Sequence, residues 1–288
     1  MKRSIWRPLI AAAILIVTVV AFVIYFVKHP EVRHQLAQTS PAVLVSLVCL
    51  DLIGIVALAF VTIATLRLCK AKLRLHESLL LTMYAAIVNF FGPLQSGPAF
   101  RAVYLKKKHN VSLKNYGVAT LVYYCFYGGI SVALLLSSTL KWWLLPLAGI
   151  GFLCLWLITK SNRLRPRLEQ LDLRGWYYLA AATFAQIFIV TIIYYLELRT
   201  VQPGVHIWQA LVYTGAANLA LFVSLTPGAI GFRESFLLFS QHLHHISDST
   251  IVAANILDRA MYIVFLLLLT LIIFATHARQ QLGVQKDD

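Results

Sequence analysis

The chain has 288 residues, of which 60% are hydrophobic and 12% charged, and its 25 Lys and Arg against 11 Asp and Glu give a net charge of +14. A soluble domain carries about 25% charged residues, so this chain has too few to cover the surface of a soluble core. The composition excludes a soluble globular protein and predicts an all-α polytopic membrane protein, with residues 1–288 forming one membrane domain.

Apolar stretches long enough to cross a bilayer, which requires about 20 residues as a helix, recur along the chain. The first follows three basic residues and exceeds the apolar core of a signal peptide, so we interpret it as a retained span. Ser40 and Pro41 predict the start of the second span, and Asp248-Ser249 is expected to cap the last one. The six predicted full spans are Leu9–Val27, Pro41–Leu66, Tyr116–Leu140, Trp142–Thr159, Trp176–Leu196 and Ile251–Ala275.

Two further apolar stretches are interrupted by Gly and Pro, which cannot continue a regular helix. Leu79–Phe91 would reach only about 20 Å as a helix before Gly92–Pro98, and Ile207–Leu225 runs into Thr226–Gly231. These patterns predict kinked spans or re-entrant hairpins, at residues 79–100 and 207–243.

Four residues are expected to support the hairpins. Asn89 and Asn218 precede the two breaks, where their amides can satisfy backbone groups that the breaks leave free. Pro93 and Gly97 lie in the first break and shape its turn.

The positive-inside rule favours hairpins over crossings. Basic residues flank the first hairpin on both sides, and a hairpin keeps both clusters on the cytoplasmic face. Six spans and two hairpins then place both termini in the cytoplasm, with 19 basic residues inside, four outside, and Arg233 and Arg259 at membrane depth. Orientation therefore accounts for most of the positive charge. The charges lie on short loops, which disfavours nucleic-acid binding.

An inverted repeat follows from this topology. Residues 41–140 and 176–275 each read span, hairpin, span, and face opposite ways. Both hairpins contain Pro-x-x-x-Gly followed by Phe-Arg. This is the plan of many secondary transporters, whose substrate sites lie at broken helices. The rest of the chain is predicted to form a first span with its external loop (residues 1–40), a further span with a basic loop (141–175) and a cytoplasmic tail (276–288).

Arg233 is the strongest candidate for a residue that binds an anion. It lies two residues past Gly231, in the first turn of a helix, where a cation opposes the helix dipole and free backbone N–H groups attract anions. A guanidinium can bind a lipid phosphate in a bidentate manner, and Arg101 is the counterpart in the first hairpin, although snorkelling explains it equally well. The lipid-phosphate site predicted from the sequence comprises Arg233, Arg101, Thr226, Pro227, Gly228 and Gly231.

The alternative for Arg233 is an internal ion pair with Asp258 or Glu234. Adjacent residues on one helix do not face each other, so Glu234 is expected to pair with Arg259 instead. Together Glu234, Asp258 and Arg259 would form a charge network that gates transport or clamps the structure. Asp51 stands alone in its span, as a proton site or an interfacial residue.

Enzymatic motifs are not recognisable. His242, His244, His245 and Asp248 have the residue types of a catalytic or metal site but no second cluster, and the topology places them in an external loop. We therefore expect no enzyme, no metal and no cofactor, and a transferase built on this stretch and Glu234 is the least favoured hypothesis.

The stretch Thr226–Leu237 resembles the Pro-Gly-x-x-Gly-x-Arg-Glu signature of the lysylphosphatidylglycerol synthetase transmembrane-region (flippase-like) family. Asn255–Arg259 resembles the Arg-bearing motif of its last helix, and Gly92–Leu105 its first-half motif. The chain departs from the family pattern at Ser96–Ala99 and Tyr123–Tyr127, where the family has acidic and Arg-Leu-Leu-Asp residues. The first half-site is therefore degenerate.

The resemblance implies a stand-alone module of the bacterial cytoplasmic (inner) membrane that binds and translocates an anionic phospholipid or polyprenyl-phosphate lipid. The alternative is a non-transporting partner that anchors or presents lipid to a separate synthase or glycosyltransferase. Membrane lipids are the expected partners in both cases, and the sequence leaves the oligomeric state open.

Overall fold

The computed structural model describes residues 37–91, 96–137, 174–223 and 232–281, with a few isolated positions between 24 and 34. These ranges are almost entirely helical, which confirms the all-α prediction. The predicted spans Leu9–Val27 and Trp142–Thr159 lie outside the described residues.

Four helices in the described part of the chain are long and apolar enough to cross a bilayer. They coincide with four of the predicted spans, and the 28 residues of α3 extend about 42 Å, which exceeds a hydrocarbon core of about 30 Å. The chain is therefore an integral membrane protein. The four helices are α3 (Pro41–Leu68), α6 (Leu113–Leu135), α9 (Arg174–Val201) and α13 (Asp248–Gln281).

Shorter helices occupy the two predicted hairpins. The α4 and α10 helices have 17 residues each, or about 25 Å, and so fall short of a full crossing. The stretch 241–244, predicted as a loop, forms one helical turn because it continues from the hairpin helix before it. The shorter helices are α4 (Leu75–Phe91), α5 (Ser96–His109), α10 (Ile207–Val223), α11 (Phe232–Phe239) and α12 (Gln241–His244).

The ends of the long helices follow local chemistry. Ser40 and Pro41 begin α3 as predicted. The cap of α13 differs from the prediction: the Ser247 Oγ accepts a hydrogen bond from the backbone N–H of Thr250 at 3.3 Å. Asp248 instead lies in the first turn, where a carboxylate favours the helix dipole.

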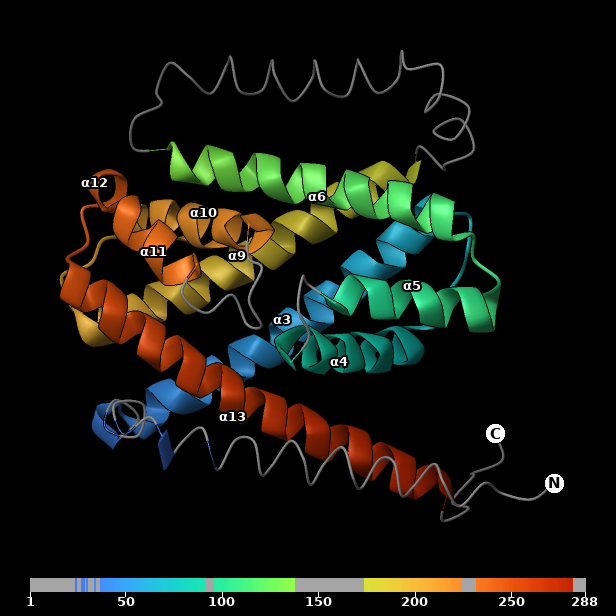
Figure 1. The fold of residues 1–288 in the computed structure, drawn as a ribbon, viewed down its shortest axis with the longest axis horizontal. Helices are drawn as coiled ribbons and strands as arrows, with labels where there is room; N and C mark the ends of the chain where they lie inside the picture. The colour runs from blue at the N-terminus through green and yellow to red at the C-terminus, as the bar shows by residue number, and fades with distance from the viewer. Residues whose placement is uncertain are drawn as a thin grey trace.

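The long helices α3 and α9 run side by side through the middle of the fold and pack along each other (Figure 1). The remaining helices surround this pair in matching ways. The α4 helix packs on α3 as α10 packs on α9, and α6 contacts α10 as α13 contacts α4. The units 41–140 and 176–275 thus make matching helix contacts, both within each unit and between the two units.

The outer surface of α9 is apolar. Tyr177, Phe184 and Phe188, spaced by seven and four residues along one face of the helix, are 84%, 63% and 58% exposed. An exposed stripe of large apolar side chains requires an apolar neighbour, and lipid provides one.

Candidate functional site

The junction between α4 and α5 is held by the residues that begin α5. The Asn89 Oδ1 accepts a hydrogen bond from the backbone N–H of Gly97 at 3.2 Å, and the Ser96 Oγ donates to the carbonyl of Val88 at 2.8 Å. A Cβ at Gly97 would lie 2.8 Å from the carbonyl oxygen of Ala85, so this approach requires glycine. Asn89 thus satisfies a backbone N–H in the first turn of α5, whereas Pro93 lies outside the described residues.

A cavity of about 360 Å³ lies where the two predicted hairpins meet the central helix pair. Every long helix and most of the shorter ones contribute to its wall, so residues far apart in the sequence converge there. Charged side chains are unusually frequent for membrane depth, where each is costly unless it has a partner or a function. The charged residues that line it are Asp51, Arg101, Arg233, Asp258 and Arg259.

Arg233 is buried, 9% exposed, and bound to the last helix. Its Nη1 donates to the Asp258 Oδ2 at 2.5 Å, so the ion pair given above as the alternative to lipid binding is present, with Asp258 as the partner. Its guanidinium carbon also lies 5.0 Å from the centre of the Tyr194 ring, a cation–π distance. One side of the guanidinium is thus occupied, while Nε and Nη2 are buried without a hydrogen-bond partner among the described residues.

A second ion pair runs beside the first. Arg259 Nε donates to the Glu234 Oε1 at 2.8 Å, and Arg259 Nη2 contacts the same oxygen. This pairing is the one predicted from helical geometry. Because the two pairs use adjacent residues on each helix, they join α11 to α13 at two points.

Arg101 differs from the other two arginines. Its Nη1 donates to the hydroxyl of Thr62 at 2.9 Å, and its Nε is buried without a partner. No ion pair forms between Arg101 and another described residue. Arg101 is therefore a partly buried cation in the cavity wall with no counter-charge among the described residues. Such a group is available to bind an anion.

Unsatisfied polar atoms concentrate at this cavity. Nine buried side-chain nitrogen and oxygen atoms in the described ranges lack a hydrogen-bond partner, and five of them belong to Arg101, Asn218 and Arg233. Both polar atoms of Asn218 are orphaned, although the residue is fully buried. The expected role of Asn218 in satisfying a broken helix is therefore not seen among the described residues. Buried polar groups left unsatisfied require an explanation, and a bound ligand would supply the missing partners.

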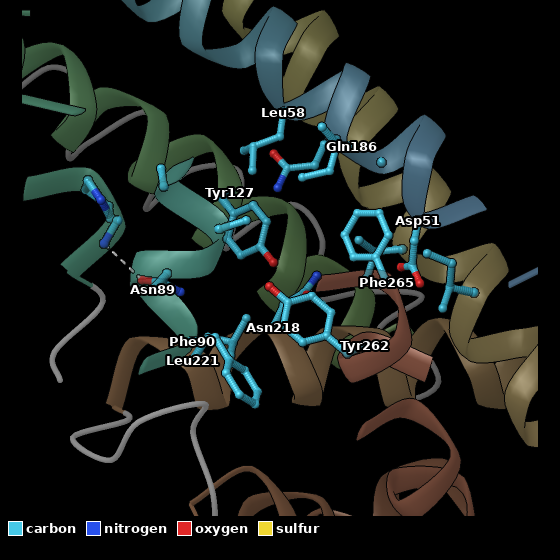
Figure 2. Close-up of a pocket in the computed structure, with 18 of the residues that line it drawn as sticks. Asp51, Leu58, Asn89, Phe90, Tyr127, Gln186, Asn218, Leu221, Tyr262 and Phe265 are labelled. Atoms are coloured by element: carbon cyan, nitrogen blue, oxygen red, sulfur yellow. Dashed lines mark hydrogen bonds between the residues drawn. The ribbon is translucent and has the colours of Figure 1, made fainter. Parts of the chain in front are cut away.

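Aromatic and amide side chains complete the wall. Figure 2 shows Tyr127, Gln186 and Tyr262 with polar ends toward the cavity, and Asp51 at its edge. Asp51 lines the cavity and makes no ion pair or hydrogen bond with a described residue.

Sequence reasoning missed several of these residues. Gln186 and Tyr194 lie inside a predicted span, where a polar residue is itself a signal. Glu197 follows directly after the predicted span and was not considered, yet it is 2% exposed and close enough to Arg233 and Asp258 for charge–charge interaction. The apolar run ended one residue before Glu197, which hid it.

Several predicted residues fall elsewhere. Thr226, Pro227, Gly228 and Gly231 lie outside the described residues. The histidines of α12 do not line the cavity, and no three His, Cys, Asp or Glu side chains of the described ranges cluster as metal ligands.

His244 is buried at the end of α12, where its ring bonds to backbone groups of neighbouring residues. Its Nε2 lies 3.1 Å from the carbonyl oxygen of Leu237, and its Nδ1 accepts from the N–H of Ile246 at 3.2 Å. Burial lowers the pKa of His244, and the backbone hydrogen bond only partly opposes this. The imidazole is thus held neutral, with its proton on Nε2.

A polar cluster closes the opposite end of the first hairpin. The Glu77 Oε1 accepts hydrogen bonds from Tyr104 at 2.7 Å, Lys108 at 2.8 Å and His109 at 2.8 Å. Burial raises the pKa of Glu77, but these three hydrogen bonds outweigh it and lower the pKa to about 2. The ionised carboxylate therefore ties the first turn of α4 to the last turn of α5.

The fold and the site define a polytopic helical membrane protein with a charged, partly unsatisfied cavity between two helical hairpins. The chain belongs to the family described as lysylphosphatidylglycerol synthase TM region, which matches residues 9–270. The family resemblance drawn from the sequence is thus confirmed. A comparison with the curated proteins gives no match.

Proposed function

We propose that this chain binds the phosphate of an anionic membrane lipid in the cavity and translocates the lipid across the bilayer. The observation that carries the proposal is the convergence of unsatisfied donors from Arg101, Arg233 and Asn218 on one cavity at membrane depth. Guanidinium groups bind phosphate through charge-assisted hydrogen bonds. A family of lipid-synthase membrane regions supports lipid as the ligand.

The binding residues differ in role. Arg101 supplies the free cation, because no described carboxylate pairs with it. Arg233 supplies its Nε and Nη2 edge while Asp258 holds the opposite side. This division reverses the sequence-based ranking, in which Arg233 came first.

Translocation is supported by the matching contacts of the two units. The α4–α5 and α10–α11 hairpins lie on either side of the cavity, and equivalent helices pack equivalently around α3 and α9. In an inverted repeat, rocking of one unit against the other exposes a central site to each side in turn. The proposal places both termini on the cytoplasmic side of a bacterial inner membrane, as the charge distribution predicts.

The test is reconstitution of the full chain into liposomes with headgroup-labelled phosphatidylglycerol. Arg101→Gln should slow translocation and weaken lipid binding about 10- to 100-fold, the usual effect of losing hydrogen bonds to a charged group. Lys107→Gln is the matched control, because Lys107 is an exposed cation on the same helix.

The outcomes separate the two functions considered from the sequence. Wild-type protein that binds the lipid without translocating it would favour the non-transporting partner and contradict transport. Arg101→Gln protein that behaves like Lys107→Gln would contradict the binding site itself.

A further inference from the structure

A second hollow adjoins the cavity, between α5 and α6. It has a volume of about 330 Å³ and is lined almost entirely by carbon. The α6 side is one continuous stripe, because its residues are spaced by three or four positions and therefore share a helix face. The stripe consists of Leu113, Tyr116, Gly117, Thr120, Leu121 and Tyr124.

The groove and the cavity are neighbours that share two wall residues. Pro98 of α5 and Tyr124 of α6 line both. Arg101 follows Pro98 by three residues and so lies on the same face of α5. A phosphate bound at Arg101 would therefore have the inner end of the groove beside it.

The outer part of the groove opens towards the lipid-facing surface. Leu113 and Leu121 are 43% and 54% exposed, as expected for side chains that meet acyl chains. Gly117 lines the groove and is exposed, and a Cβ built there would meet no atom within 4 Å. A larger side chain at this position therefore has room to occupy the hollow.

We infer that this groove holds one acyl chain of the lipid whose phosphate occupies the cavity, and that it is the lateral route by which the lipid enters. The inference rests on the proposed function. An apolar groove suits a hydrocarbon chain, and its position beside a cavity lined by arginines suits a molecule with a charged head and an apolar tail. A neighbouring protein helix is the other conceivable occupant, and it would not need the cavity.

The test uses the full chain in nanodiscs that contain phosphatidylglycerol with a photoreactive diazirine in one acyl chain. After irradiation, mass spectrometry locates the cross-linked peptides. Wild-type protein should cross-link between residues 113 and 124. Gly117→Leu should lower that yield about tenfold, the loss expected when roughly two methylenes are kept out of an apolar site.

Gly129→Leu provides the matched control. Gly129 lies on the same helix, a Cβ there also meets no atom within 4 Å, and it lines neither the groove nor the cavity. Unchanged melting temperatures of both variants would show that the fold is intact. If Gly117→Leu and Gly129→Leu cross-link alike, the groove assignment is overturned.

Two comparisons distinguish failure of the groove from failure of the headgroup site. A diazirine-bearing diacylglycerol, which lacks the phosphate, should cross-link much less, and equal yield would overturn the shared occupancy. If Arg101→Gln leaves phosphatidylglycerol binding unchanged while Gly117→Leu removes the cross-link, the headgroup assignment fails and an acyl-chain groove is supported. If Arg101→Gln abolishes binding while Gly117→Leu has no effect, only the groove fails.

Discussion

Arg233 and Asp258 stand 25 residues apart in the chain, and their side chains meet at 2.5 Å between Nη1 and Oδ2. Glu234 and Arg259, the next residue on each helix, form the second pair with the charges reversed in order. Two ion pairs of opposite polarity therefore join α11 and α13 at the wall of the cavity. The α11 helix supplies the cation in one pair and the anion in the other. The pair that contains Arg233 is the more buried one, since its side chains are 11% and 17% exposed against 17% and 26%.

This difference in burial predicts unequal losses of stability. Asp258→Asn leaves a buried guanidinium without its counter-charge and should lower the free energy of unfolding by about 3–5 kcal/mol. Glu234→Gln should cost less, because water screens the remaining charge of Arg259 more effectively. Thermal denaturation of both variants in the same detergent measures the difference, and equal losses would contradict it.

A double variant separates the structural role of Arg233 from its binding role. Replacing both partners, as in Arg233→Met with Asp258→Leu, removes both charges and should recover most of the stability lost in Asp258→Asn. Lipid binding should remain weak in this variant, because the Nε and Nη2 donors are gone. Recovery of stability together with full lipid binding would show that Arg233 acts only as a clamp.

Gly215 sets the distance between α10 and α6. A Cβ at this position would lie 2.3 Å from the backbone nitrogen of Leu135 and 2.5 Å from the carbonyl oxygen of Ser131. Since both are backbone atoms, the helices must separate, and Gly215→Ala should cost about 1–3 kcal/mol. Gly129→Ala on α6 meets no atom within 4 Å, so a melting temperature at or above that of the wild type is expected for it.

His244 predicts a loss of stability at mildly acidic pH. Its lowered pKa means that the unfolded chain binds the proton more readily than the folded protein. The stability that neutral His244 contributes is complete above the ordinary pKa of about 6.5. It is lost as the pH falls towards the lower pKa that His244 has in the folded protein. Protonation would also place a hydrogen on Nδ1, which now accepts from Ile246.

Melting temperatures at pH 7.5 and 5.5 test the predicted direction of this pH dependence. The wild-type protein should melt lower at pH 5.5, and His244→Asn should lose most of this pH dependence. His206→Gln should retain it, because His206 is exposed. A wild-type protein that is more stable at pH 5.5 would refute the neutral, buried histidine.

The sequence by itself determined the class of protein and the local design of its helices. Apolar length predicted the four spans that are described, Gly and Pro marked both breaks, and helical spacing predicted that Glu234 would pair with Arg259. These features depend on residues close together in the chain or on the period of one helix, and a local pattern is sufficient to reveal them.

Tertiary structure alone decided which residues face the cavity. The α3 helix is apolar on all sides, and because lipid is as apolar as the protein interior, its sequence does not mark the face that turns inward. Only helix packing brings Asp51 to the cavity wall, leaves Arg101 without a carboxylate partner among the described residues and buries Asn218 unsatisfied. The groove beside Gly117 likewise forms only where α5 and α6 lie next to each other.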